Sequence, residues 1–588
     1  MEQTTIKTDW DLKKYFYDSV QSEQYNKDIE AYSAKAEAFI SKYKGKIASL
    51  NDEEFLTFYQ DMDALGVEAE KVMIFLFLLS SLNTQDQDLN KENSRVGKIF
   101  EKVNRKLLFI SEELKIVGYD KMIYYSNLES MKPYKNPILN HANSLKYILS
   151  EAEEKVYMQV SQACGEDIYE ELTASFEFDV DGKKMTQDEV RSLRESQDRE
   201  ERKKAFQSLS TVFLNKQNQI VLGQLYALVC KSTVLDIELR GYKTVMSERN
   251  ISEEVSDETV NVLLDTIEKN YSVYHKFLKK KAEILGLEKL ETYDIFAPYS
   301  VDKTETYSFE KGWELYMDTI KKADKKLADF SQEMLDNGRI SVYPNLGKTG
   351  GAFAQYTKSL PEFVLLNWTD AYSDVTTLAH ELGHAFHGNL SKVQTDMAFS
   401  TPLILAETAS IFNETLMFET ILANTKDEQL KKKLVYDRLD DIFATIFRQV
   451  MYVNFERKCH QSFLDNSPLT YGDFNNLWFA EVCELYGPGV NIDEKLVNYG
   501  WSSIPHIFHT PFYCYTYAFG NIISLNLFQM YKDSTNKDEF LTKYHSFLAA
   551  GGSDTPENLL RDIFGLEFNE SFYSLAFKHI EDLLGKLD

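Results

Sequence analysis

Cysteine is scarce in this chain. Its 588 residues include five cysteines, which lie far apart and form no Cys-x-x-Cys pair. Such usage is typical of reduced thiols and predicts a cytoplasmic protein. One of the five, Cys514, falls within a tyrosine-rich segment, where we expect it to be a bystander.

Long apolar segments are also missing. Residues 1–15 carry charges and no apolar centre, so we expect no signal peptide. The longest apolar run, Val72–Leu79, is too short to span a bilayer and predicts a buried helix instead. The chain has no internal repeat and no low-complexity tract.

Positive charge is in deficit, because 65 lysines and arginines stand against 92 aspartates and glutamates, for a net charge of −27. This balance argues against nucleic acid and against an anionic membrane as partners. The apolar fraction of 43% is ordinary for a globular protein. A chain of this length forms several domains, or one large helical body with lobes.

Among only 10 histidines, two stand in the segment His380-Glu381-Leu382-Gly383-His384. On a helix, positions i and i+4 lie on one face, so both imidazoles can bind one metal ion. The carboxylate of Glu381 can then reach a water on that metal. The pattern predicts a zinc peptidase in which His380 and His384 are ligands and Glu381 is the general base.

The competing interpretation is a polar helix face with two ordinary histidines. The surrounding sequence weighs against it, because apolar residues recur at helical spacing and the histidines fall on a different face. We expect Ser373 or Asp374 to cap the start of this helix. The apolar face consists of Val375, Leu378, Leu382 and Ala385.

A catalytic zinc usually has three protein ligands and an open position for water. A third histidine of the metzincin type is excluded, because Leu390 occupies its place. Glu407 instead interrupts the apolar run that follows Pro402. A carboxylate in such surroundings is costly unless it is paired or binds metal, so we predict Glu407 as the third ligand. The alternative is an exposed helix glutamate.

Two further polar residues lie near these ligands in the sequence. Glu414 interrupts the same apolar run, and we expect it to orient a ligand from behind, with a solvated position as the alternative. His387 is either a partner of the site or a core histidine, and the core position is favoured.

A short strand is predicted shortly before the histidine motif in the sequence. Phe363–Asn367 is apolar and lies between Pro361 and the turn-like Thr369-Asp370. Gly350-Gly351-Ala352-Phe353 precedes it and can run close to a ligand, because glycine lacks a side chain. We expect an edge strand here to pair with an extended substrate peptide, with an ordinary structural hairpin as the alternative.

Tyr513, Tyr515 and Tyr517 alternate in one segment near the C-terminus. A tyrosine hydroxyl aimed at the oxyanion of a tetrahedral intermediate supplies a hydrogen bond besides the metal. The alternative is packing, since the chain contains 35 tyrosines.

With these residues the sequence resembles the thimet-oligopeptidase-like metallopeptidases, and most closely their oligoendopeptidase F branch. The resemblance extends from about Trp10 to the C-terminus. One departure is His509, where this branch more often has an aromatic residue, so either His506 or His509 contacts substrate. The segments that carry the resemblance are His380–His387, Ala406–Glu414, Gly347–Phe353, Pro505–Gly520, Arg240–Tyr242, Tyr293-Asp294 and Gly551–Ser553.

The resemblance implies a mainly α, two-lobed helical metallopeptidase with a small β-sheet beside the active site and an internal substrate channel. Members cleave short peptides and spare folded proteins. One zinc ion per chain is implied, although cobalt or manganese suits the same donors. The metal ligands carry over onto His380, His384 and Glu407, the base onto Glu381, and the transition-state donors onto His506, Tyr513 and Tyr517.

We expect three domains: an N-terminal helical lobe at 1–110, an oligoendopeptidase N-terminal-type domain at 111–195, and the zinc-peptidase catalytic domain at 196–588. Phe176–Val180 followed by Asp181-Gly182 predicts a β-hairpin near 176–185. Thr186–Glu189 predicts a capping box, and Asn51–Glu54 predicts a helix start. We expect a monomer or a loosely associated homo-oligomer.

Three functions compete at this stage. The first is a zinc endopeptidase acting on short peptides. The second is a zinc carboxypeptidase or dipeptidyl carboxypeptidase, which needs a cationic or tyrosine site for the terminal carboxylate of its substrate. The third is a non-catalytic helical protein that binds peptides, in which Glu381 is dispensable.

Overall fold

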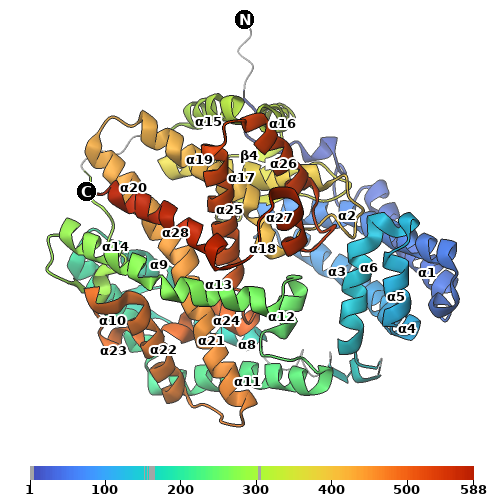
Figure 1. Cartoon of the computed structure of the whole chain (residues 1–588), viewed down its shortest axis with the longest axis horizontal. Coiled ribbons are helices and arrows are strands. Elements are labelled where there is room, and N and C mark those ends of the chain that lie inside the picture. The colour runs from blue at the N-terminus through green and yellow to red at the C-terminus, as the bar shows by residue number, and fades with distance from the viewer. Residues whose placement is uncertain (1–5, 151, 155, 158–165, 302–305) are drawn as a thin grey trace, which may run out of the picture. The chain divides into compact units, whose positions relative to one another are not determined.

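The computed structural model describes residues 6–150, 152–154, 156–157, 166–301 and 306–588. These residues are predominantly helical, with three small sheets (Figure 1). The prediction of a mainly α fold is confirmed. Four of the five cysteines are free thiols, and Cys164 lies outside the described residues.

The chain divides into two compact units, each assembled from three segments. Unit 1 comprises Met1–Glu151, Glu305–Ile421 and Leu527–Leu566. Unit 2 comprises Ala152–Thr304, Leu422–Asn526 and Glu567–Asp588. The division into 1–110, 111–195 and 196–588 stays a prediction.

Unit 1 contains the N-terminal helices and the helix with the histidine motif. Its helices are α1 (Glu23–Tyr43), α2 (Asp52–Leu82), α3 (Gln87–Leu107), α4 (Phe109–Val117), α5 (Tyr119–Ser126), α6 (Lys135–Ser144), α15 (Phe309–Ala323), α16 (Lys325–Asp336), α17 (Tyr372–Ser391), α18 (Leu403–Ala406), α26 (Lys537–Ala549) and α27 (Pro556–Phe564). Two helices contribute residues to both units, α19 (Thr408–Asn424) and α25 (Tyr515–Asp533).

Unit 2 contains the tyrosine-rich segment. Its helices are α8 (Glu166–Ala174), α9 (Gln187–Leu193), α10 (Arg199–Phe213), α11 (Lys216–Arg240), α12 (Ser247–Ser252), α13 (Asp257–Lys269), α14 (Tyr271–Ile284), α20 (Glu428–Ile442), α21 (Gln449–Leu464), α22 (Tyr471–Tyr486), α23 (Glu494–Val497), α24 (Pro505–His509) and α28 (Glu570–Gly585).

The strands are short. In unit 1, β6 (Phe363–Leu365) is the central strand of a three-stranded sheet, parallel to β4 (Ile340–Ser341) and antiparallel to β5 (Phe353–Gln355). In unit 2, β1 (Phe178–Val180) pairs with β2 (Lys183–Met185), and β3 (Leu290–Glu291) pairs with β7 (Val490–Asn491). The strand predicted at 363–367 is therefore confirmed at 363–365, and β5 is an edge of its sheet.

Local chemistry explains several element boundaries. The predicted hairpin turns at Asp181 and Gly182, whose φ angles of 55° and 81° suit a turn that needs left-handed backbone. The predicted helix start at Asn51 and the predicted capping box at Thr186 are confirmed, and both α2 and α9 begin with a capping box. These signals are local, so the sequence alone suffices to find them.

The start of α17 differs from the prediction. Ala371 occupies the N-cap position, so the expected cap at Ser373 or Asp374 is wrong. The Asp374 carboxylate instead accepts the N–H of Ala371 at 3.0 Å and that of Thr369 at 2.7 Å. In a capping box the acidic side chain at the third helical position binds the backbone N–H of the N-cap residue, which is the contact that Asp374 makes with Ala371.

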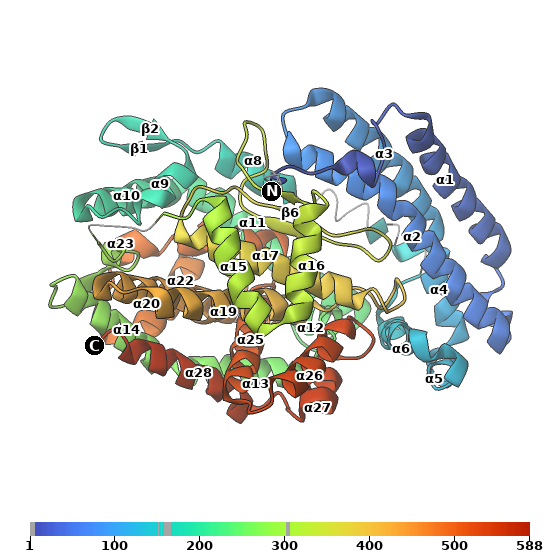
Figure 2. The ribbon, with the colours of Figure 1, turned by 90° about the horizontal axis from the view of Figure 1, so that it is seen from above.

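The apolar face of α17 is buried as predicted. Its side chains pack against α15, α16 and α26, and Figure 2 shows α15 and α16 side by side with α17 behind them. The opposite face carries the histidines. All four residues of the predicted apolar face are fully buried: Val375, Leu378, Leu382 and Ala385.

The length and hydropathy of α11 would suit a membrane-spanning helix, and 33% of its most apolar window is buried. Among the described residues no other helix meets these criteria, and a core helix of a globular protein meets them as well. It packs against α21 and α22 and ends in an ion pair between Arg240 and Glu154 at 2.7 Å. The apolar character of α11 is hard to see in the sequence, because polar residues interrupt its apolar run, whereas Val72–Leu79 is uninterrupted. The absence of a membrane partner stays a prediction.

Candidate active site

The three predicted metal ligands converge in unit 1. The Nε2 atoms of His380 and His384 lie 3.4 Å and 3.3 Å from Oε2 of Glu407. Ligand atoms of the three residues all lie within 4.8 Å of one another. Glu407 stands at the junction of α18 and α19.

These separations suit a zinc ion. Zinc binds nitrogen and oxygen ligands at about 2.0–2.2 Å, and a tetrahedron of that size places its ligands about 3.3–3.6 Å apart. The 3.4 Å and 3.3 Å separations agree with that range. Two imidazoles and a carboxylate also form a common donor set of catalytic zinc sites, which keep a fourth position open. The residues therefore fit the metal.

Glu414 binds the ring nitrogen of His380 that faces away from the metal position. Its Oε2 accepts a hydrogen bond from Nδ1 of His380 at 3.0 Å, which leaves Nε2 directed at Glu407 and the metal position. Burial lowers the pKa of His380, but the bond to Glu414 and the charge of Glu407 outweigh burial and raise the pKa to about 9. This is the contact expected of a residue that orients a ligand.

Glu407 is held as an anion. Burial raises the pKa of its carboxyl, but the hydrogen bond with His384 and the charges of both imidazoles lower it to about 2. The hydroxyl of Ser410 also donates to Oε2 of Glu407 at 2.7 Å. To bind a metal a carboxylate must be ionised and an imidazole neutral, so a bound zinc would take the place of the imidazole charges beside Glu407.

Glu381 is buried beside the edge strand of the sheet. Only 6% of its surface is exposed, and burial raises the pKa of its carboxyl, while a hydrogen bond with the backbone of Ala354 acts in the opposite direction. Ala354 is the middle residue of β5. The structure thus brings the glycine-rich segment, the edge strand and the candidate base together.

His387 and Tyr356 also lie near the candidate metal site in unit 1. His387 is buried, its pKa is lowered to about 4 by burial, and it hydrogen-bonds the backbone of Ala406, which agrees with the favoured core position. Tyr356, which follows β5, was missed by the sequence analysis. Burial raises the pKa of Tyr356 to about 12, with further contributions from the charges of Glu407 and Glu381. The only sequence signal for it is its proximity to the glycine-rich segment.

The predicted transition-state donors form a cluster in unit 2. The ring of His506 stacks on that of Tyr513 with centroids 5.9 Å apart, and its Nε2 lies 3.5 Å from the hydroxyl of Tyr517. His506 is exposed, whereas Nε2 of His509 is 2.9 Å from a carboxylate oxygen of Glu170. The structure therefore groups His506 with the two tyrosines and pairs His509 elsewhere.

The remaining members of the tyrosine-rich segment face inward. Cys514 and Tyr515 are buried, and the hydroxyl of Tyr515 donates to Oδ1 of Asn250 at 2.9 Å. These contacts suit packing rather than contact with substrate.

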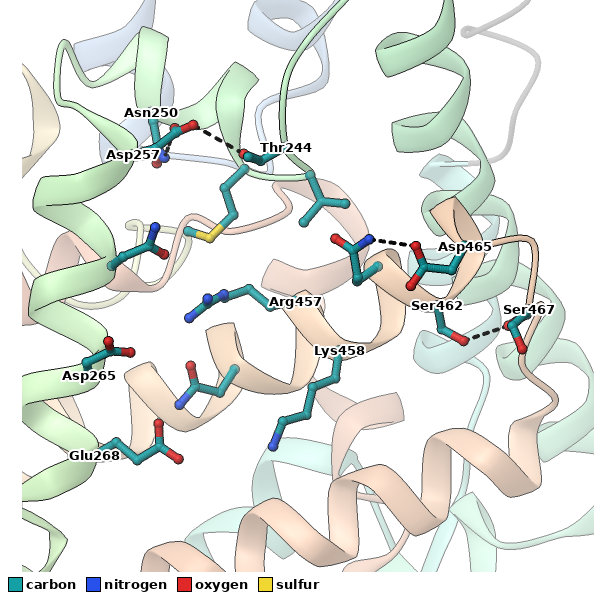
Figure 3. Close-up of a pocket in the computed structure, with 15 residues that line it drawn as sticks. Thr244, Asn250, Asp257, Asp265, Glu268, Arg457, Lys458, Ser462, Asp465 and Ser467 are labelled. Carbon is teal, nitrogen blue, oxygen red and sulfur yellow. Dashed lines mark hydrogen bonds between the residues drawn. The ribbon is translucent and has the colours of Figure 1, made fainter.

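A cavity of about 790 Å³ lies in unit 2 between α13 and α21 (Figure 3). Arg457 and Lys458 point into it from α21, and Asp265 and Glu268 from α13. None of the predicted site residues lines it, although Asn250, which holds Tyr515, forms part of its wall.

Comparisons with known proteins give the family of the chain. Residues 192–578 match the sequence profile of peptidase family M3. The chain is 27% identical over 560 residues to the oligoendopeptidase F homolog of Lactococcus lactis subsp. lactis, covering 91% of this chain and 90% of that protein. It is 25% identical over 568 residues to oligopeptidase PepF of Bacillus subtilis, covering 94% and 82%.

Solved structures share the fold. A crystal structure from Chlamydophila abortus covers 99% of this chain and 98% of its own, with a TM-score of 0.87 and 22% identity. Oligoendopeptidase-F from Enterococcus faecium covers 96% and 98%, with a TM-score of 0.70 and 20% identity.

Proposed function

Because the chain belongs to peptidase family M3 and is a metalloendopeptidase of the oligopeptidase F type, we propose that it is zinc-dependent and hydrolyses internal bonds of short oligopeptides, with Glu381 as general base. The observation that supports this most strongly is the convergence of His380, His384 and Glu407 on one position beside Glu381.

The roles of the residues follow from their chemistry. Zinc bound by His380, His384 and Glu407 would supply a Lewis acid and lower the pKa of water to about 7. Glu381 accepts a proton from the attacking water and delivers it to the leaving amine. Its raised pKa favours both steps, because a base that returns a proton near neutral pH works best with a pKa close to that pH.

The substrate backbone has a candidate partner in β5. This strand is an edge of its sheet, so one side of its backbone is open to an added strand, and Ala354 within it already bonds to Glu381. We assign transition-state donation to His506, Tyr513 and Tyr517, since they cluster and are accessible. A substrate channel stays part of this proposal.

Cleavage of peptides blocked at both ends tests the proposal. An endopeptidase cuts an internal bond of a short peptide with an acetylated N-terminus and an amidated C-terminus, and a zinc chelator stops the reaction. A carboxypeptidase leaves such a peptide intact but trims its free-acid form. Mass spectrometry of both digests, with and without chelator, distinguishes the two activities. The cytoplasmic location and the oligomeric state stay predictions.

A further inference from the structure

Glu456, on α21, is a buried carboxylic acid that makes its hydrogen bond through one of its two oxygens. None of its surface is exposed, and its Oε1 accepts the backbone N–H of Phe512 at 2.8 Å. Its Oε2 has no hydrogen-bond partner within the part of the chain that the structure describes. Burial raises the pKa of this carboxyl to about 8. A buried acid with so few partners opposes folding, which points to a role for the bond it makes.

Phe512 has an unusual backbone. Its φ angle is +61°, a left-handed conformation that is unfavourable for a residue with a bulky side chain. Its ring is buried against the ring of His460 at 4.8 Å between centroids, and Nδ1 of His460 lies 3.0 Å from the hydroxyl of Thr233. Ring packing and the bond to Glu456 together hold this turn, because strained residues persist only when their surroundings over-determine them.

The turn at Phe512 determines where Tyr513 lies. Between α24 and α25 the chain reverses, and the N–H of Tyr513 bonds to the carbonyl of Thr510 at 3.2 Å. The Tyr513 ring then stacks on the ring of His506. The guanidinium of Arg249, on α12, lies 6.0 Å from the centroid of the Tyr513 ring. A change in φ at Phe512 therefore swings the Tyr513 ring out of this stack.

A second contact secures the other side of Tyr513. The side chain of Asn250 accepts a hydrogen bond from the hydroxyl of Tyr515. It also donates a hydrogen bond to Asp257 at 2.7 Å, and Figure 3 shows both Asn250 and Asp257 at the wall of the cavity. The bond to Asn250 thus holds Tyr515, on the C-terminal side of Tyr513, and the residue directly on its N-terminal side is Phe512. Glu456 holds that residue through its main chain.

We propose that Glu456 is a positioning residue whose bond to the Phe512 N–H holds the left-handed turn and so places the Tyr513 hydroxyl for catalysis. The catalytic part of this inference rests on the proposed function. The bond between Glu456 and Phe512 can be tested without it.

Three variants separate the possibilities. Glu456→Gln keeps a carbonyl acceptor in the same place, and Glu456→Met keeps the volume without one. Arg457→Met is the matched control, because the neighbouring side chain on α21 points into the cavity instead (Figure 3). Where the Met variant does not fold, Glu456→Asp, which retracts the acceptor by one methylene, replaces it with the same expected direction.

Hydrogen exchange of the segment 510–515, read by mass spectrometry on the zinc-loaded chain, is the first measurement. In Glu456→Met the Phe512 amide should exchange at least about tenfold faster, because its buried acceptor is gone. In the same variant kcat should fall at least about tenfold while KM and zinc content hold, since the lost contact acts in the transition state. Glu456→Gln and Arg457→Met should resemble the wild type in both measurements.

Several results would overturn the proposal. Unchanged exchange in Glu456→Met shows that the acid does not hold the turn. Faster exchange with a wild-type kcat shows that the turn does not matter for catalysis. A loss of kcat that merely follows lost zinc or lost folding assigns Glu456 a purely structural role. A Gln variant as slow as the Met variant shows that the rate does not depend on the acceptor for the Phe512 N–H. If the wild type itself shows no chelator-sensitive cleavage, the proposed function fails and the catalytic part fails with it, while the exchange comparison still decides the bond to Phe512.

Discussion

A Cβ atom on Gly383 would stand 2.6 Å from the carbonyl oxygen of Ala409. The middle of the histidine motif on α17 therefore meets the backbone of α19 with no room for a side chain. Glu407 lies just before α19, so this close approach determines how near its carboxylate comes to His380 and His384.

Gly383→Ala should separate α17 from α19 and impair metal binding. The added methyl group clashes with backbone atoms, which cannot rotate away as a side-chain tip can. We expect a lower melting temperature and clearly less than one zinc per chain by elemental mass spectrometry. Gly97→Ala is the control, since its Cβ meets nothing within 4 Å and alanine is favoured in a helix. Normal zinc content in Gly383→Ala would show that the close approach is not needed for the site.

Glu381→Gln should retain zinc and lose nearly all turnover. The amide has nearly the same size as the carboxylate but cannot accept a proton from water, and a positioned base contributes about 10²–10⁴-fold to rate. Stopped or continuous assays with a fluorogenic peptide give kcat, and elemental analysis gives the zinc content. Substantial remaining activity would remove the base assignment.

Tyr513→Phe should lower kcat more than it raises KM. Loss of one hydrogen-bond donor to a developing oxyanion typically costs about 10²–10³-fold in kcat, because the bond strengthens only in the transition state. Tyr124→Phe, at an exposed tyrosine of unit 1, serves as the control. If KM alone changes in Tyr513→Phe, the hydroxyl is a substrate-binding group.

Asp396 should make the stability of the protein depend on pH. Burial and the neighbouring carboxylates of Glu70 and Asp63 raise the pKa of Asp396 from 3.8 to about 7. The folded state then binds this proton more tightly than the unfolded state, so the stability that the protonated form confers is fully present below pH 3.8 and is lost as pH rises through about 7.

Asp396→Asn removes this titration and keeps a donor for Glu70. The melting temperature of the variant relative to wild type should therefore rise between about pH 4 and pH 8, in the direction that linkage requires. Differential scanning calorimetry at several pH values measures the difference, with Asp18→Asn at an exposed carboxylate as the baseline. A difference that is flat across this range would contradict the raised pKa.

Features encoded by neighbouring residues were the ones that the sequence predicted. The i, i+4 spacing of His380 and His384 places both imidazoles on one helix face, and the hairpin at Asp181-Gly182 needs only its turn residues. Glu407 was identified because a carboxylate in an apolar run requires a partner.

Features that depend on packing between distant segments were not predicted. The contact of Gly383 with Ala409 and the bond of Glu456 to Phe512 each join elements that no periodicity relates. The start of α17 at Ala371 was missed for a different reason, because alanine has no capping side chain and only the contact from Asp374, at the third helical position, to the N–H of Ala371 is made.

Anomalous X-ray scattering across the zinc absorption edge tests the central claim most directly. Crystals of the zinc-loaded chain should show one anomalous peak at about 2.0–2.2 Å from Nε2 of His380, Nε2 of His384 and a carboxylate oxygen of Glu407, and crystals of Glu407→Ala should show a weaker peak or none. A peak at another position would contradict the account. Full peptidase activity of a purified protein that is shown to contain no metal would contradict it as well.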